Sequence, residues 1–247
     1  MPHRDSSVRY WPDGGMAAYP EAPTNLQVLR ASTLLNSLTE DQISDLGGVS
    51  HMAYAERAET IWINGSDVDF FGVVGIGFVK MTRSTAAGHD VTTELMGPGQ
   101  VFGLLGALEG SGCPQTAKAV CNTWYLKVPK RRFFDVYREN LVLKEALVRR
   151  TTTRLRSSYE MIARMSTGKV DQRIAAILFM VAESYGTEDG KTIRINVPLT
   201  RQDIAEMAGT TVESTIRVMS AWQKKKWIET ESRTISILNP DSLAELI

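Results

Sequence analysis

Three polar residues near the C-terminus are spaced for contact with the base edges of DNA. On a helix, Glu213, Ser214 and Arg217 would lie about one turn apart on one exposed side. In the major groove, an arginine can bond guanine O6 and N7 together, and a glutamate can accept from cytosine N4. Three lysines follow at the predicted helix end, where they could contact phosphates: Lys224, Lys225 and Lys226. These residue types predict sequence-specific DNA binding.

A helix-turn-helix would hold these side chains in place. Thr200 is typical of the residue that caps a first helix, and Gly209 would end that helix. Thr210 and Glu213 have the spacing of a capping box, so we expect the second helix to begin after Thr210. Residues 227–238 then alternate as two short strands, which predicts the wing of a winged helix.

Each of these features has a simpler structural explanation. Glu213 and Arg217 are also spaced as an i, i+4 surface salt bridge, which contributes only about 0.2–0.5 kcal/mol. The lysine run could be a solvated helix end. The combination of a capped turn, a polar helix start and a wing favours DNA recognition over these alternatives.

The preceding part of the chain predicts a β-sandwich followed by a long helix. Short β-branched and aromatic runs punctuated by glycine, from about Val49 to Pro129, indicate an antiparallel sandwich or barrel. Residues 141–165 lack proline and glycine, and their seam positions recur at alternating spacings of three and four, as in a coiled coil. The seam positions are Val148, Thr151, Leu155, Ser158, Ile162 and Met165. We expect this helix to pair in parallel with a second copy.

The alternative for this helix is packing against its own domain. The residues that could serve such an intramolecular face are Leu141, Leu143, Leu147 and Tyr159. After the helix, Thr167 and Gly168 are the hinge candidates, because glycine absorbs large changes in backbone dihedral angles.

The motif TRQDIAEMAGTTVESTIRVM, residues 200–219, resembles the helix-turn-helix of the CRP/FNR family of bacterial transcription regulators. Glu213 and Arg217 stand where the family's base-reading residues stand, and Val212 is closer to the FNR-like branch. Upstream, AETIWINGSD, VVGIGFV and AGHDVTTELMGPGQVFG resemble the family's jelly-roll signatures, so the resemblance covers about residues 26–247. It implies an α+β fold with an antiparallel β jelly-roll sensor domain, a long dimerisation helix and a C-terminal winged helix-turn-helix.

The residue patterns and the resemblance together predict four segments and two sets of contact residues. The segments are a flexible N-terminal tail (1–24), a sensor domain (25–140), a dimerisation helix with hinge (141–168) and a DNA-binding domain (169–247). The expected DNA-binding residues are Thr200, Arg201, Thr211, Val212, Glu213, Ser214, Arg217, Lys224, Lys225 and Lys226. The expected dimer residues are Val148, Thr151, Leu155, Ile162 and Met165.

The effector pocket departs from the cyclic-nucleotide branch of the family. That branch follows a β-roll glycine with a ribose-binding Glu and later carries Arg-Ser or Arg-Thr for the cyclic phosphate. Here the Glu position is Leu104, the Arg-Ser pair falls on Cys113 and Pro114, and no arginine occurs between Gly103 and Lys130. A buried phosphate would therefore lose its charge-assisted bidentate partner, so we do not expect cAMP binding. The pocket candidates are Gly103, Leu104, Leu105, Cys113, Pro114, Gln115, Thr116, Ser158 and Tyr159.

Other cofactors have little support in the sequence. An FNR-type iron–sulfur centre is not expected, because it requires an N-terminal cysteine cluster and both cysteines, Cys113 and Cys121, lie in the β-roll. A redox role for this pair is an alternative, and so is haem, although His3, His51, His89 and ten methionines show no diagnostic ligand spacing. We predict no metal site and no enzymatic activity, which makes a cupin-like metalloenzyme the weakest hypothesis.

Composition restricts how DNA could be bound. The 247 residues carry 28 Lys plus Arg against 28 Asp plus Glu, which excludes broad electrostatic coating of nucleic acid. Affinity must therefore come from a few placed contacts, doubled by dimerisation. The chain shows neither a secretory signal nor a membrane span, so we expect it to lie in the cytoplasm. From the seam and the resemblance, we expect a homodimer whose partners are double-stranded DNA and RNA polymerase. A β-roll that serves only as a dimer scaffold or polymerase contact is a further alternative.

Overall fold

The computed structural model describes residues 21–86, 88–110 and 112–247, except for the side chains of residues 164–167. The sequence predictions that lie outside this description are all but the last four residues of the tail 1–24, the candidate ligand His3, and the side chains of Met165 and Thr167. The described chain combines helices with antiparallel sheets, which confirms the predicted α+β fold class.

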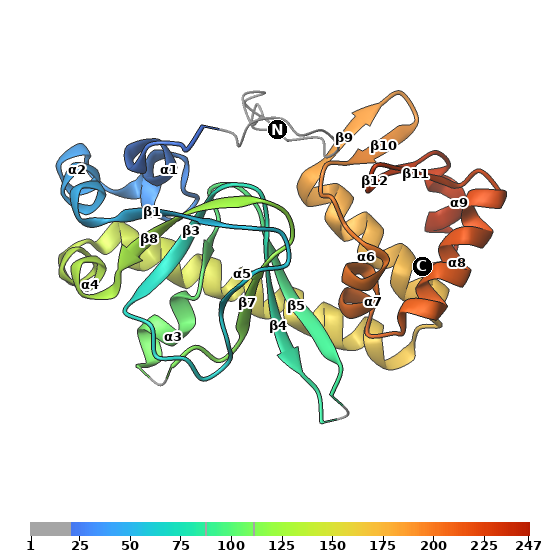
Figure 1. The fold of residues 1–247 in the computed structure, drawn as a ribbon, viewed down its shortest axis with the longest axis horizontal. Coiled ribbons are helices and arrows are strands. Elements are labelled where there is room, and N and C mark those ends of the chain that lie inside the picture. The colour runs from blue at the N-terminus through green and yellow to red at the C-terminus, as the bar shows by residue number, and fades with distance from the viewer. Residues whose placement is uncertain (1–20, 87, 111) are drawn as a thin grey trace.

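Residues 51–129 form a β-sandwich, the β-roll, built from two four-stranded antiparallel sheets (Figure 1). The first sheet contains, in spatial order, β1 (His51–Ala55), β8 (Thr123–Pro129), β3 (Phe70–Ile76) and β6 (Val101–Phe102). The second contains β2 (Thr60–Trp62), β7 (Thr116–Ala119), β4 (Val79–Ser84) and β5 (Asp90–Met96). Side chains from both sheets share one core, which includes Trp62, Val74, Met81, Phe102 and Tyr125. The glycine-punctuated β-branched runs thus form the predicted sandwich.

Short helices cover one side of the first sheet. They are α1 (Asn25–Ala31), η1 (Leu35–Ser37), α2 (Glu40–Val49), α3 (Leu104–Glu109) and α4 (Lys130–Glu139). The Thr39 hydroxyl accepts from the backbone N–H of Gln42 at the start of α2, as the sequence spacing predicts. The helices and the sheet bury a second core in which Phe71 and Phe133 meet edge to face.

Helix α5 (Leu141–Thr167) runs along the β-roll and continues to the C-terminal domain (Figure 1). Its first two turns are anchored by Leu143 and Leu147, whose side chains are buried in the second core. Farther along, Arg150 Nη2 donates to the carbonyl of Val101 at 2.6 Å. Both apolar and polar contacts therefore fix α5 on the β-roll.

The C-terminal domain packs helices against a small antiparallel sheet. Its elements are α6 (Val170–Tyr185), β9 (Gly186–Asp189), β10 (Thr192–Ile195), α7 (Arg201–Ala208), α8 (Val212–Lys224), β11 (Ile228–Glu231), β12 (Thr234–Ile237) and α9 (Pro240–Ala244). The sheet order is β11-β12-β10-β9, so the predicted wing pairs with a second hairpin that we did not predict. Ile174, Ile204, Trp222 and Ile235 belong to the single core that joins the helices to this sheet.

Within the described residues, none of the helices combines the length and the hydropathy needed to cross a membrane.

Candidate nucleic-acid interface

The first helix of the helix-turn-helix is capped at both ends. The Thr200 hydroxyl accepts from the N–H of Asp203 at 3.1 Å, and the Asp203 carboxylate accepts from the N–H of Thr200 at 2.8 Å. This reciprocal capping box satisfies two backbone donors at the start of α7. Gly209 ends the helix with φ of +57°, a left-handed conformation that glycine adopts without steric cost.

The second helix begins one residue later than the sequence analysis predicts. The N–H of Thr210 donates to the carbonyl of Ala205, so Thr210 completes the end of α7. The Thr211 hydroxyl instead accepts from the N–H of Ser214 at 3.2 Å and caps α8. The predicted capping box of Thr210 and Glu213 is therefore wrong. The turn after Gly209 contains one more residue than the capping-box spacing predicts.

Helix α8 turns its polar side outward. Glu213 and Arg217 are exposed, whereas Thr215 and Met219 are buried against the rest of the domain. Backbone N–H bonding, followed by the Thr211 hydroxyl, lowers the pKa of the Glu213 carboxyl. It is therefore ionised at neutral pH and acts only as an acceptor. Within the described residues no ion pair joins Glu213 to Arg217, so the salt-bridge alternative is not what the structure shows.

The wing and the start of α7 are joined beside this surface. Arg201 is half-buried and its Nη2 donates to the Thr230 hydroxyl on β11 at 3.1 Å. Burial lowers the pKa of the Arg201 guanidinium. At the wing tip, Ser232 and Arg233 have φ of +46° and +69°. A two-residue hairpin with both residues left-handed twists in the same sense as its strands, and here it places exposed side chains at the tip.

The three lysines lie at the far end of α8. Lys224 is exposed in the last turn, and Lys225 Nζ lies 4.4 Å from the centre of the Trp227 ring. Lys226 is left-handed, with φ of +56°. At 1.5 Å per residue, about 18 Å of helix separates Lys224 from Val212. The three lysines therefore form a charged patch distinct from the surface around Glu213.

The predicted seam of α5 is open to solvent. Val148, Leu155 and Ile162 are 66%, 49% and 61% exposed, although all three are apolar. The hydroxyls of Thr151 and Ser158 donate back to the carbonyls four residues earlier in the helix. The side chain of Met165 lies outside the description.

The intramolecular alternative for α5 applies to only part of the helix. Leu143 and Leu147 pack on the β-roll. Leu141 and Tyr159 are 67% and 63% exposed, so the proposal that they also serve that face is wrong. A helix buries only one side on a single domain, and these two residues point away from it.

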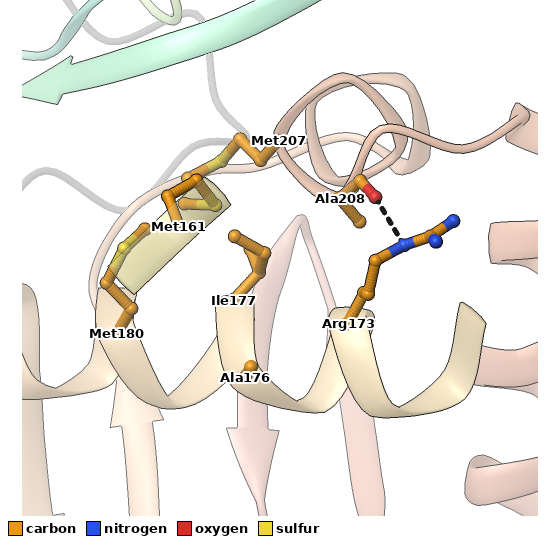
Figure 2. A pocket seen from close by; sticks show the side chains of 7 residues that line it. All are labelled: Met161, Arg173, Ala176, Ile177, Met180, Met207 and Ala208. Carbon is orange, nitrogen blue, oxygen red and sulfur yellow. Dashed lines mark hydrogen bonds between the residues drawn. The ribbon is translucent and has the colours of Figure 1, made fainter. Parts of the chain in front are cut away.

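An arginine that the sequence analysis missed holds the predicted hinge. Helix α5 ends at Thr167, and the Gly168 carbonyl accepts from Arg173 Nη1 at 3.2 Å. Arg173 Nε also donates to the Ala208 carbonyl at 3.0 Å, at the end of α7 (Figure 2). One side chain thus joins the α5–α6 connection to the helix-turn-helix. No local sequence pattern marks this role, because its partners are carbonyls brought together only by the fold.

Methionines surround the apolar end of this connection. Figure 2 shows Met161 of α5, Met180 of α6 and Met207 of α7 gathered around a shallow pocket. The pocket is also lined by Ile177 and by Ala176, Ala208 and Arg173. Its volume of about 10 Å³ holds no more than a water molecule. It is a packing junction between three helices.

In the β-roll, aromatic side chains occupy the region beside the candidate effector residues. Trp62 stacks on Phe102 with ring centres 5.2 Å apart, and both are buried. Gly103 is left-handed with φ of +77°, and a Cβ there would lie 2.6 Å from the Trp62 ring. Leu104 is buried in the neighbouring core and Leu105 is exposed. The glycine is thus required by local packing, with or without a ligand.

The loop that would face the cyclic phosphate is occupied with internal bonds. Cys113 is buried, and burial is the main cause that raises the pKa of its thiol. The Gln115 carbonyl accepts from Trp62 Nε1 at 3.0 Å, and the Thr116 hydroxyl accepts from the Asn64 N–H at 3.0 Å. Pro114 beside them is half-buried.

Other candidate ligands are scattered. Ser158 and Tyr159 are exposed on α5 and make no hydrogen bond to the described part of segment 103–116. His51 and His89 are exposed, and the described part of the chain contains no group of three or more His, Cys, Asp or Glu residues arranged to hold a metal ion.

Two family models match the chain. The Crp-like helix-turn-helix domain matches residues 172–246, and the cyclic nucleotide-binding domain matches residues 53–140. The CRP-like cAMP-activated global transcriptional regulator of Mycobacterium tuberculosis is 27% identical over 192 residues, covering 76% of this chain and 84% of the relative. The fumarate and nitrate reduction regulatory protein of Vibrio cholerae is 22% identical over 212 residues, covering 86% and 84%.

The fold is shared with solved structures at low sequence identity. FixK2 from Bradyrhizobium japonicum superposes with a TM-score of 0.70 at 19% identity, covering 80% of this chain and 97% of that chain. A mutant of CooA from Carboxydothermus hydrogenoformans also gives a TM-score of 0.70, at 17% identity, covering 90% and 99%.

Proposed function

The chain belongs to the CRP/FNR family of transcription regulators and carries its helix-turn-helix DNA-binding domain, and we propose that it binds as a homodimer to a palindromic site of two inverted TGA-type half-sites. The observation that carries this proposal is the exposed start of α8. There Glu213 and Arg217 project from a capped helix without neutralising each other.

The side chains of α8 suggest a role for each base of the half-site. Arg217 bonds the guanine, Glu213 accepts from the paired cytosine, and Val212 contacts a thymine methyl. Thr200, Arg201, Thr211 and Ser214 lie around the starts of α7 and α8, where phosphate contacts would set the register. The patch of Lys224, Lys225 and Lys226 would contribute phosphate contacts of its own farther along the DNA.

The exposed seam of α5 supports the homodimer. Three apolar side chains at coiled-coil spacing are open to solvent on a helix whose start is packed on the β-roll. A parallel pair would bury Val148, Leu155 and Ile162 in both copies. A two-fold dimer also places the recognition helices about one DNA turn apart, ~34 Å.

For the β-roll, we propose an effector other than cAMP, or none. Leu104 stands where the cyclic-nucleotide branch has glutamate, and it is buried. Trp62 and Phe102 fill the adjoining core, and no arginine lies between Gly103 and Lys130 to bind a phosphate. A regulator of this kind would act in the cytoplasm, with RNA polymerase as partner. Native mass spectrometry and an absorption spectrum of the purified dimer test for a bound haem, nucleotide or metal.

Selection of binding sites from random DNA tests the DNA-binding proposal. Arg217→Ala should relax the guanine preference by about 1–3 kcal/mol, because one bidentate contact is lost. The matched control is Lys224→Ala on the same helix, which should weaken binding without changing the selected bases. If Arg217→Ala selected the same half-site as the wild type with equal stringency, the proposed recognition would be wrong.

A further inference from the structure

A lysine of the β-roll is buried against the helix-turn-helix. Lys80 Nζ on β4 lies 2.7 Å from Asp203 Oδ1 and 2.6 Å from Glu206 Oε2 on α7. Only 9% of the Lys80 side chain is exposed, and the two carboxylate side chains are 10% and 9% exposed. The Thr92 hydroxyl on β5 donates to the same Glu206 oxygen at 3.2 Å. These four residues are hereafter the Lys80 clamp, in which the two β-roll residues lie more than a hundred positions before the two carboxylates in the sequence.

The clamp holds the element that supports the recognition helix. Asp203 uses Oδ1 for Lys80 and Oδ2 for the N–H and hydroxyl of Thr200, so one carboxylate serves both the clamp and the cap of α7. Met207 of α7 and Met219 of α8 belong to one buried core. A displacement of α7 on the β-roll would therefore carry α8 with it.

Strand β5 also connects this clamp to the dimerisation helix. Glu94, two residues after Thr92, accepts from Arg154 Nε of α5 at 3.0 Å. The register of β5 against β4 shifts between these two residues, so a β-bulge separates the two side chains. A single strand therefore contacts α7 through Thr92 and α5 through Glu94.

A second contact fixes α6 at the end of the same strand. The Tyr185 hydroxyl donates to the Leu95 carbonyl at 3.0 Å and accepts from the Gly97 N–H at 3.2 Å. With the tyrosine at one end and the clamp at the other, the DNA-binding domain is held at two separate points. Two attachments resist rotation, which the short connection through Gly168 alone would allow.

We propose that Lys80 is a positioning residue for DNA recognition, which fixes the orientation of α8 relative to the α5 seam and thereby the half-site spacing that a dimer accepts. This inference rests on the proposed function, because spacing has meaning only for a dimer on two half-sites. Lys80 lies in the β-roll, remote from the reading surface, and acts through α7.

Half-site spacing is a sensitive measure of this orientation. Adding one base pair moves one half-site by about 3.4 Å and rotates it by roughly 34°, since a turn contains 10–10.5 base pairs. A rigidly held pair of recognition helices matches one spacing. Recognition helices on loosened domains can match several half-site spacings, but the protein then binds the best-spaced site more weakly.

The experiment measures the affinity of the full-length protein for duplexes whose two selected half-sites are separated by the best spacer and by spacers one and two base pairs longer or shorter. For the wild type we expect at least a tenfold loss at one added or removed base pair. For Lys80→Met we expect that loss to fall below threefold, with weaker binding to the best spacer. The guanine preference that depends on Arg217 should remain.

Matched variants separate positioning from general damage. Lys118 lies directly opposite Lys80 on β7, and its side chain has no hydrogen bond or ion pair within the described residues, so Lys118→Met should keep the wild-type spacing profile. Lys80→Arg retains the cation and should recover the spacing preference. Glu206→Gln keeps the side-chain shape and the α7 cap, so it carries the test if Lys80→Met does not fold.

Amide hydrogen exchange in DNA-free protein gives a readout that does not depend on dimerisation. Lys80→Met or Glu206→Gln should raise exchange in α7, whereas Lys118→Met should not. Unchanged spacing profiles and unchanged α7 exchange would overturn the inference. A wild type that binds one half-site as tightly as two would refute the proposed dimeric recognition instead, and the exchange data would still decide whether Lys80 clamps α7.

Discussion

Replacing Leu155 by alanine should weaken the dimer by a factor that the structure allows us to estimate. Complete burial of a leucine side chain contributes about 1.5–3 kcal/mol. Leu155 is 49% exposed in one chain, so pairing has about half of that, ~1 kcal/mol, left to gain. A two-fold dimer contains the residue twice. The loss is then about 2 kcal/mol, or roughly 30-fold in Kd.

Sedimentation equilibrium over a concentration series would measure this dissociation constant. Thr153→Ala is the matched control, because Thr153 is exposed on the same helix but lies about 160° around it from Leu155. The control should leave the dimer constant unchanged. DNA affinity should fall with the dimer constant in Leu155→Ala alone. A change of less than threefold for Leu155→Ala would refute the assignment of this seam as the dimer contact.

Three further predictions concern the β-roll. Gly72→Ala should destabilise the fold by about 1–3 kcal/mol in urea unfolding, because the new Cβ would lie 2.1 Å from the Phe102 ring; an unchanged midpoint would contradict this packing. Burial, and then Glu59, raise the pKa of Tyr125 to about 12, so its stabilising contribution relative to Tyr125→Phe is complete below pH 10 and lost as the pH rises through about 12. Unfolding curves of both proteins across that range would reveal a constant difference if the phenol ionised normally. Thiol alkylation of the native protein should modify Cys121 before Cys113, because Cys113 is buried and its thiol pKa is raised; mass spectrometry showing the reverse order would contradict this environment.

Local signals in the sequence were sufficient for most individual elements. Thr39 and Thr200 mark helix starts because a threonine hydroxyl and a residue three positions on form a bond within one turn. The start of α8 was misplaced by one residue, because the path of the chain after Gly209 decides whether Thr210 or Thr211 is extended. The β9–β10 hairpin does have a local signal in the sequence, the Asp189-Gly190 pair between alternating residues.

Contacts between distant segments left no such signal. In the sequence, Lys80 is indistinguishable from an ordinary strand lysine, and Arg173 from a surface residue of α6. Their roles depend on partners at α7 that only the fold brings close. The exposed face of α5 could be predicted from its periodicity. Its division into a packed start and an open seam could not, because that depends on where the β-roll ends along the helix.

The Lys80 clamp limits the exchange of domains between regulators of this architecture. A chimera that joins this C-terminal domain to another β-roll would bury Asp203 and Glu206 against a surface without their cation. Unpaired buried carboxylates are costly, so such a fusion would tend to leave the C-terminal domain undocked. Transplanting β4 and β5 together with α6 to α9 would keep the partners, and the unit of modular design in this protein is therefore larger than its DNA-binding domain.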